Sequence, residues 1–398
     1  MKTKIKNLKN KQGGITLVAL VITIIILLIL ATISIQSLTN TGLFQKANKA
    51  KDKTKNATEN QAKTLNEYED AMNEYFSNST AVKEQFKGKT VEEAIKYADL
   101  LSKDNNIELK DAKNNKIIIP AGFKVVSDDT TNNAKTVDKG IVIEDMTNTT
   151  TKGSQFVWVP VGTITKEDGS TITISLNRYS FDENGNSTAK NDEIIETYFQ
   201  ELENTDKGNI GAKNITNFKN SVATNGGYYI GRYEARTNII RTSNNDTLTK
   251  VTEKSNDNIY TFVTQSQASE LSKDMYQNEN FTSDLINSYA WDTAILYIQN
   301  STEEKSYAKQ TSLNSGSIAN NGTNNLNDNN KIDVKCNIYD MSSNVYEWNT
   351  ETSLYENNSC VYRGGSFDFN IPYTSTRSIG NTQGYGGHVG FRPILYIK

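Results

Sequence analysis

The residues of this chain that could do chemistry lie near the end of the printed sequence. Asp340 and Glu347 are two acids seven positions apart, within the segment IYDMSSNVYEW at 338–348. Two further motifs follow, VYRGGSF at 361–367 and GFR at 390–392. The two acids either contribute oxygens to a bound cation or cap a turn without metal. The local sequence leaves both possibilities open.

Composition excludes several kinds of site. The chain has one histidine, His388, so a metal centre built from several histidines is excluded and a serine–histidine relay has little scope. Glycine motifs that bind phosphates or dinucleotides are absent. The net charge is -3 and the lysines form no basic stripe, so we expect no nucleic-acid partner.

Short strands and long loops must position these motifs. Runs rich in β-formers are bounded by Asn, Asp and Thr, and two later segments have helical character. Thr90 and Glu93 form a capping box, which predicts a helix to about residue 102. We expect strands at 117–126, 140–143, 156–161 and 227–234, helices at 267–275 and 283–299, and loops at 163–222 and 301–331.

The motifs at 338–348, 361–367 and 390–392 together resemble the C-terminal core of the formylglycine-generating, sulfatase-modifying family, a variant of the C-type lectin fold. The runs at 156–161 and 227–234 resemble early strands of that family. The resemblance implies an α+β, loop-rich, C-type-lectin-like domain, which we expect at 116–398.

In the resembled family, the segment matching 340–347 wraps a Ca²⁺ ion. The resemblance implies side-chain oxygens from Asp340 and Glu347 and backbone carbonyls from Ser343 and Val345. Calcium takes about six to eight oxygen ligands, and this arrangement supplies part of that set. Ser343 stands where the family usually has glycine, which weakens the site if the backbone there needs a positive φ.

Cysteines bear on the enzyme question. The generating enzymes of this family use a pair of redox-active cysteines shortly before the terminal GFR motif, but 366–390 contains no cysteine here. We therefore expect no formylglycine-generating activity. Cys336 and Cys360, the chain's two cysteines, each precede a family motif, and the resemblance implies a structural disulfide between them in an oxidising environment.

Without catalysis, ligand binding is the function that the sequence favours. Aromatic residues alternate with small polar ones between 365 and 390, a composition that suits an adaptable contact surface. Some relatives of the resembled fold diversify the equivalent segment, and an ordinary exposed loop is the alternative. The predicted ligand-binding residues are Phe367, Asp368, Phe369, Asn370, Tyr373, Asn381, Tyr385 and His388.

The N-terminal sequence predicts a membrane anchor. A leader with five lysines and no acid at 1–14 precedes an apolar run at 15–35. Such a run makes about 31 Å of helix, which matches a bilayer core of about 30 Å. We expect a transmembrane helix at 15–38 and a single-pass membrane protein whose large domain lies outside the cell.

The leader, its final glycine pair and the apolar run resemble the N-terminus of a type IV prepilin or pseudopilin. The resemblance implies a prepilin peptidase that cuts after Gly14 and methylates Ile15, and other pilin-like subunits as partners. The fifth mature residue is Ala19 where the family usually has Glu, so the buried amine of a neighbouring subunit would lack its carboxylate. An uncleaved anchor is the alternative.

Between anchor and domain we expect a helical stalk at 39–77, because apolar residues recur at helical spacing over 65–76. We expect a helical connector at 78–115, which contains the helix that begins at the capping box of Thr90. The sequence thus predicts a membrane-anchored, pilin-like surface protein that displays a ligand-binding domain for a glycan or a protein, with Ca²⁺ as the one candidate cofactor. A structural minor pseudopilin and a sulfatase-modifying enzyme are the alternatives.

Overall fold

The computed structural model describes the following residues: 17–40, 48–51, 53–58, 61, 63–64, 90–96, 104–126, 134–147, 149–190, 194–195, 199–201, 215–255, 257–311, 333–353, 359–367, 372–381 and 386–398. The chain divides into two compact units, Met1–Tyr75 and Phe76–Lys398. Each unit is described by itself.

The first unit corrects the predicted membrane anchor. Its helix α1 is Leu17–Asn40, and the structure describes the side chains of residues 20–32 on it. Over the described residues, no helix combines the length and apolar character needed to cross a membrane. A span needs about 20 consecutive apolar residues. The predicted transmembrane helix at 15–38 and the predicted single-pass membrane location are therefore wrong.

The predicted stalk is also corrected. Helical residues are described at 48–51, 53–58, 61 and 63–64, and among the described residues no helix extends over the predicted stalk at 39–77. The predicted processing site, Gly14 and Ile15, lies outside the described residues. In the predicted helical connector, residues 107–110 form a strand instead of a helix.

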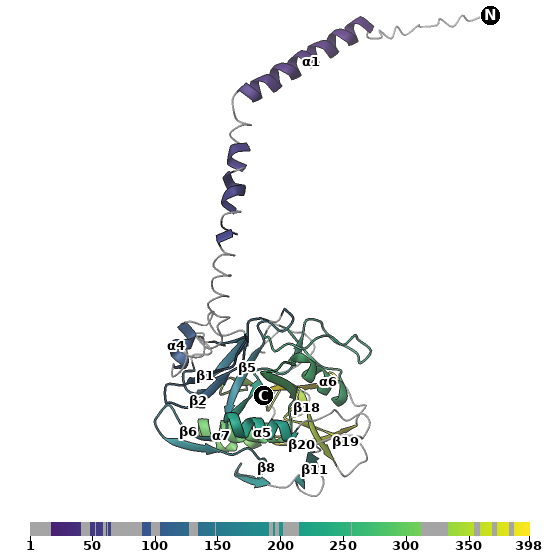
Figure 1. The fold of residues 1–398 in the computed structure, drawn as a ribbon. Helices are drawn as coiled ribbons and strands as arrows, with labels where there is room; N and C mark the ends of the chain where they lie inside the picture. Colours follow the sequence, from purple (N-terminus) through teal and green to yellow (C-terminus); the bar gives the residue numbers. More distant parts are fainter. Residues whose placement is uncertain are drawn as a thin grey trace, which may run out of the picture. The chain divides into compact units, whose positions relative to one another are not determined.

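The second unit combines helices with several small antiparallel sheets (Figure 1). One six-stranded sheet has the order β15-β22-β12-β5-β4-β3. Its strands are β3 (Phe123–Val126), β4 (Val142–Asp145), β5 (Gln155–Pro160), β12 (Gly227–Gly231), β15 (Phe281–Leu285) and β22 (Pro393–Ile397). All their pairings are antiparallel, and the last strand of the chain lies between β15 and β12.

The second six-stranded sheet carries the chemical motifs. Its path is β10-β11-β18-β19-β20, and β21 pairs with β18 in parallel. Its strands are β10 (Ile194–Ile195), β11 (Phe199–Glu201), β18 (Tyr346–Ser353), β19 (Ser359–Arg363), β20 (Arg377–Asn381) and β21 (Val389–Phe391). Because β18 contacts β11, β19 and β21, it is the strand that joins the motifs.

Five two-stranded ladders complete the described strands. Two of them, β6–β7 and β8–β9, are hairpins within the stretch 163–222 that we predicted as loop. The ladders pair β1 (Ile107–Lys110) with β2 (Lys116–Ile119), β6 (Gly162–Thr165) with β7 (Thr171–Ile174), β8 (Arg178–Phe181) with β9 (Ser187–Lys190), β13 (Arg236–Thr237) with β14 (Asn258–Ile259), and β16 (Val334–Lys335) with β17 (Ile338–Tyr339).

The described helices of this unit are α4 (Val91–Lys96), α5 (Ile215–Asn225), α6 (Gln265–Met275) and α7 (Ser288–Thr302), with short 3-10 helices η2 (Val137–Lys139) and η3 (Lys305–Lys309). The capping box at the start of α4 is confirmed, because Thr90 N donates to Glu93 and Glu93 N donates to Thr90 Oγ1. The predicted helix at 267–275 is confirmed as α6. The predicted helix at 283–299 begins later, at Ser288, because residues 281–285 form β15.

One hydrophobic core holds these elements together. Its largest members are three tryptophans, each at most 1% exposed: Trp158 on β5, Trp291 on α7 and Trp348 on β18. Helix α5 packs on β12 and β22, while α6 lies beside β15 and β18 (Figure 1). Burying a large aromatic side chain contributes about 1.5–3 kcal/mol, so the three indoles fix both sheets and α7 to one core.

Candidate functional site

The start of β18 is the place where motifs far apart in the sequence meet. β21 pairs with it so that Glu347 lies opposite Gly390 and Trp348 lies opposite Phe391. β19 pairs with it on the other side, with Glu347 opposite Arg363. The segments 338–348, 361–367 and 390–392 are therefore neighbours in one sheet.

Arg392 and Glu347 form a fully buried ion pair at this place. Nε of Arg392 donates to Oε2 of Glu347 at 3.0 Å, and Nη2 donates to Oε1 at 2.5 Å. The remaining guanidinium hydrogens reach the carbonyls of Gly231 and Tyr339. A two-point arginine–carboxylate contact fixes the relative orientation of its partners, so this pair locks β18 to β12 and to β17.

A second buried carboxylate holds the turn that precedes β18. Glu234 accepts a hydrogen bond from the backbone N–H of Val345 at 3.0 Å and another from the side chain of Asn344. Asn344 has φ of 67°, a left-handed conformation that asparagine tolerates better than most residues. Burial, and then the charges of Asp340 and Glu347, raise the pKa of Glu234 well above its ordinary value.

Acids outnumber arginines around this pair. Burial raises the pKa values of Glu253, Asp333 and Asp340, and for Asp340 the charge of Asp333 adds to this effect and brings its pKa to about 6. Arg236 and Arg392 act in the opposite direction on Asp340. The turn before β18 is therefore an acidic site whose protonation changes near neutral pH.

The predicted calcium ligands lie together, but their side chains are already engaged. Both carboxylate oxygens of Glu347, a predicted calcium ligand, accept hydrogen bonds from the guanidinium of Arg392. Asp340 accepts a hydrogen bond from Ser343 Oγ at 3.1 Å, and Val345 N–H is bound to Glu234. Within the described residues, no group of three or more His, Cys, Asp or Glu side chains could hold a metal ion. In this structure Arg392 occupies the carboxylate of Glu347, and calcium binding stays a prediction.

The predicted recognition residues separate into two places. Phe367 packs against Ile259 and Val345, and its N–H donates to the Asn344 carbonyl at 2.8 Å. The His388 ring stands edge-on to Tyr346 at 6.2 Å. Tyr373 lies elsewhere, beside η3, with the ammonium of Lys309 over its ring at 5.0 Å. Asp368, Phe369, Asn370 and Tyr385 lie outside the described residues, as does the side chain of Asn381 on β20.

Tyr362 is a residue that sequence reasoning missed. Its ring centre lies 4.7 Å from that of Tyr346 and 5.5 Å from that of Trp348. Together with His388 these rings form a set that we call the aromatic row: Tyr346, Trp348, Tyr362 and His388. The signal was present, because alternate residues of a strand share a face and Tyr362 lies opposite Trp348 in the ladder.

Cys336 and Cys360 do not form the predicted disulfide. Cys336 lies in the turn between β16 and β17, where its Sγ donates to the Asp138 carbonyl at 3.4 Å. Cys360 is buried on β19, between Thr352 of β18 and Gly380 of β20. The two cysteines thus remain thiols in separate environments. Burial raises the pKa of Cys336 to about 12, which keeps its thiol protonated.

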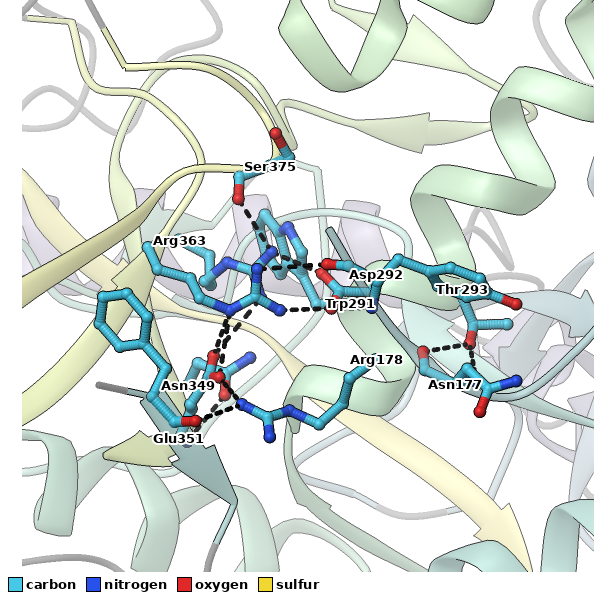
Figure 2. A network of polar contacts seen from close by, with 12 residues as sticks. Asn177, Arg178, Trp291, Asp292, Thr293, Asn349, Glu351, Arg363 and Ser375 are labelled. Atoms are coloured by element: carbon cyan, nitrogen blue, oxygen red, sulfur yellow. Dashed lines mark hydrogen bonds and ion pairs between the residues drawn. The ribbon is translucent and has the colours of Figure 1, made fainter. Parts of the chain in front are cut away.

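A buried charge network connects the sheet that contains β18 to helix α7 (Figure 2). Arg363 donates to Asp292 at 2.6 Å and to the Ser375 carbonyl at 3.2 Å, and its guanidinium lies 5.5 Å from the ring centre of Trp291. Arg178 donates to Glu351. Because Asp292 is on α7 and Glu351 on β18, the network joins the helix to the sheet.

Arg377 completes the charge network by binding both acids, Asp292 and Glu351. Burial alone would raise the pKa of Glu351, but the guanidinium groups of Arg377, Arg178 and Arg363 outweigh it and lower the pKa to about 2. The network has three arginines and two carboxylates, and Glu351 stays ionised at neutral pH. Its role is structural: it fixes β18, β19 and β20 against α7.

Comparisons with known proteins do not assign a family. No family model matches the chain, and no curated protein matches it. One similar solved structure is that of CarF, with 18% identity, 29% of this chain covered and a TM-score of 0.23; the chain spans about half of that protein, 48%. Another is Treponema denticola variable protein 1, with 11% identity, 61% of this chain and 95% of that one covered, and a TM-score of 0.30. Both scores are too low to indicate a shared fold.

The comparisons therefore give no family evidence for a pilin, a sulfatase-modifying factor or a C-type lectin. Those descriptions rest on short motifs at the two ends of the chain. Together with the absence of a spanning helix from the described residues, this corrects the expected description of the chain as a membrane-bound pilin-like or lectin-type protein.

Proposed function

We propose that this protein is a ligand-binding protein without catalytic activity, and that the aromatic row and Phe367 contact its ligand. The aromatic row supports the proposal because some of its side chains are anchored in the core while others reach the surface. Trp348 is 1% exposed and Tyr346 5%, whereas Tyr362, His388 and Phe367 are only half-buried. Aromatic rings with polar edges offer a flat apolar face and hydrogen-bonding groups to the same ligand.

The frame behind this surface suits binding. Phe367 is tied by its N–H to Asn344, and the His388 carbonyl accepts from the N–H of Tyr346 at 2.9 Å. Asn344 is held in turn by Glu234, and the neighbouring Glu347 by Arg392. A surface that is fixed before the ligand arrives loses less conformational entropy on binding.

Thiol chemistry has little support from either cysteine. A thiolate is the reactive form of cysteine, and the pKa of Cys336 is raised by burial to about 12. Cys360 is fully buried in the sheet. These observations favour binding over a thiol-dependent oxidation such as the resembled enzymes perform.

A binding screen with the full-length protein tests the proposal. The probes are a printed glycan array and a library of purified secreted proteins. Each is tested once with about 2 mM Ca²⁺ and once with a chelator. We expect a specific ligand whose affinity falls about tenfold or more in His388→Ala, because hot-spot contacts are worth about 1–3 kcal/mol. Ile379→Ala is the matched control, since Ile379 is exposed on β20 and belongs to neither the aromatic row nor the charge network.

The outcome that contradicts the proposal is clear. If no probe binds specifically in either condition, the protein is not a binding protein for these ligand classes. If a ligand binds but His388→Ala and Ile379→Ala bind it as wild type does, the aromatic row is not the contact surface. An affinity lost only with the chelator would assign a role to calcium.

A further inference from the structure

A hollow of about 430 Å³ lies on the second unit, away from the aromatic row. Four segments that are distant in sequence form its wall: η2, the turn between β6 and β7, the end of α7 and the turn at Cys336. Its charged residues are Asp138, Lys139, Lys166, Glu167, Asp168 and Glu303. Four acids and two lysines leave a net charge of about -2 in the hollow.

One carboxylate oxygen of this wall has no hydrogen-bond donor. Asp138 is 1% exposed, and its Oδ1 accepts from the Glu167 N–H at 3.2 Å. Its Oδ2 is buried and has no hydrogen-bond partner among the described residues. The charged group near Oδ2 is Nζ of Lys139, which lies on the same wall at 3.9 Å, beyond hydrogen-bond reach. A buried carboxylate oxygen without a donor is costly, so this atom offers an acceptor to an incoming cation.

The end of α7 adds a second favourable contribution. α7 has 15 residues and no basic side chain in its last turn, so the negative end of its dipole faces this wall without a cation of its own helix. Ser301 and Thr302 from that last turn line the hollow, and the Ser301 Oγ is buried.

The hollow already accommodates one ammonium group. Nζ of Lys166 lies 2.8 Å from Glu303 and 3.5 Å from Asp168, and the Lys166 side chain is 7% exposed. An ammonium is thus stable at this wall although it is largely removed from water. A metal ion is less suited, because within the described part of the chain no three acidic, His or Cys side chains lie close enough together to hold one.

We propose that this hollow binds the ammonium group of a small organic amine. The ammonium donates to Asp138 Oδ2, and the rim acids Glu167 and Glu303 contribute longer-range attraction. Lys139 competes with the ligand for Asp138, since its Nζ lies 3.9 Å from Asp138 and 3.6 Å from Glu167, and its side chain is 49% exposed. The site is independent of the proposed recognition surface.

Isothermal titration of the full-length protein with 1,4-diaminobutane tests this proposal. 1,4-Butanediol is the neutral probe of the same length, and calcium chloride is the metal alone. We expect binding of the diamine, none of the diol, and a weaker affinity when NaCl rises from about 50 to 500 mM, because exposed rim charges are screened.

Two variants change the affinity in opposite directions. Asp138→Asn keeps the shape of the side chain and should weaken the diamine at least tenfold. Lys139→Ala removes the competing ammonium and should tighten it about threefold, and this half-exposed residue is safe to change even if Asp138→Asn does not fold. Glu108→Gln, on the exposed hairpin β1–β2, is the control and should change nothing.

Three results with the wild-type protein overturn the proposal, and one result with a variant does so as well. The first is that the diamine does not bind at about 10 mM. The second is that the diol binds as tightly as the diamine. The third is tighter binding of calcium than of the diamine, which would mark a metal site instead. If Lys139→Ala weakens the diamine, Asp138 is not the group that receives the ammonium.

Discussion

Removing the charge of Asp292 tests the buried network of Figure 2 most directly. Asp292 is fully buried on α7 and accepts three hydrogen bonds: from Arg363 at 2.6 Å, from Arg377, and from the Tyr179 N–H at 2.9 Å. Asp292→Asn keeps the side-chain shape. Its amide retains one acceptor oxygen and turns an N–H₂ group toward donors.

The magnitude follows from the charges. In the wild type, three arginines face two carboxylates, an excess of one positive charge. The variant raises the excess to two in a place with no exposure for Arg178 or Arg363. Breaking a buried pair by removing one partner costs about 3–5 kcal/mol, and each lost bond to a charged group about 1.5–3 kcal/mol. We expect the free energy of unfolding to fall by about 4 kcal/mol.

Urea unfolding followed by tryptophan fluorescence measures this change, since Trp291 lies against Arg363. With a slope of about 3 kcal/mol per molar urea, the midpoint should fall by about 1.3 M. The matched control is Glu108→Gln, whose exposed pair with Lys116 at 3.1 Å should contribute less than about 0.5 kcal/mol.

A double variant separates charge from shape. Arg363→Met added to Asp292→Asn removes one of the uncompensated guanidinium groups, so the pair should be less destabilised than the sum of the single variants by about 1 kcal/mol or more. A urea midpoint for Asp292→Asn within about 0.3 M of the wild-type midpoint would refute the reasoning, because the charge of Asp292 would then contribute little to the free energy of unfolding.

Three further predictions concern the site before β18 and its surroundings. Glu347→Gln should lower the free energy of unfolding by about 3–5 kcal/mol, because it strands the buried guanidinium of Arg392; a loss under about 1 kcal/mol in urea melts contradicts this. The pKa of Asp340 is raised from 3.8 to about 6 by burial and by the charge of Asp333, so the folded state holds the proton more tightly. Protonated Asp340 stabilises the folded state fully below about pH 4, and this stabilisation is lost as the pH rises through 6. Because Asp340 is partly exposed, we expect the stabilisation to be about 1–2 kcal/mol. Asp340→Asn tolerates the φ of 60° and should abolish that slope, and an unchanged slope between pH 4 and 7 would exclude Asp340 as its source. Cys336 in the native protein should resist iodoacetamide at pH 8 because burial raises the pKa of its thiol to about 12, and labelling as fast as in urea, read by intact mass, is the contrary result.

Local signals predicted the local structure. The capping box of Thr90 and Glu93 predicted the start of α4, and the β-rich runs predicted β5 and β12. The hairpin β6–β7 was missed although its signal is present: threonine and isoleucine alternate on both sides of Asp168–Gly169, a turn pair typical of hairpins. The prediction of loops there followed from the Asn, Thr, Lys and Gly content of the whole stretch, and this composition concealed the short alternating runs.

The candidate site was only partly predictable, because its interactions join distant parts of the chain. The motif around Glu347 could be recognised, but its partner Arg392 is 45 residues away and Glu234 is 111 residues from Val345. Nothing local in the sequence shows whether an acid binds an arginine or a cation. In this structure Glu347 pairs with Arg392, and its predicted role as a calcium ligand stays a prediction.

The balance of buried charges differs between the network around Asp292 and Glu351 and the site around Glu347. Around Asp292 and Glu351 the arginines are in excess, and the pKa of Glu351 falls to about 2, so Glu351 stays ionised over the physiological range. Around Glu347 the acids are in excess, and the pKa of Asp340 rises to about 6. One end of β18 therefore carries Glu351, which does not titrate near neutral pH, while the other end, where the aromatic row begins, is coupled to Asp340, which titrates near pH 6. If the aromatic row binds a ligand, its affinity should depend on pH through the turn at 340–345, and Asp340→Asn should remove that dependence without changing the residues in contact.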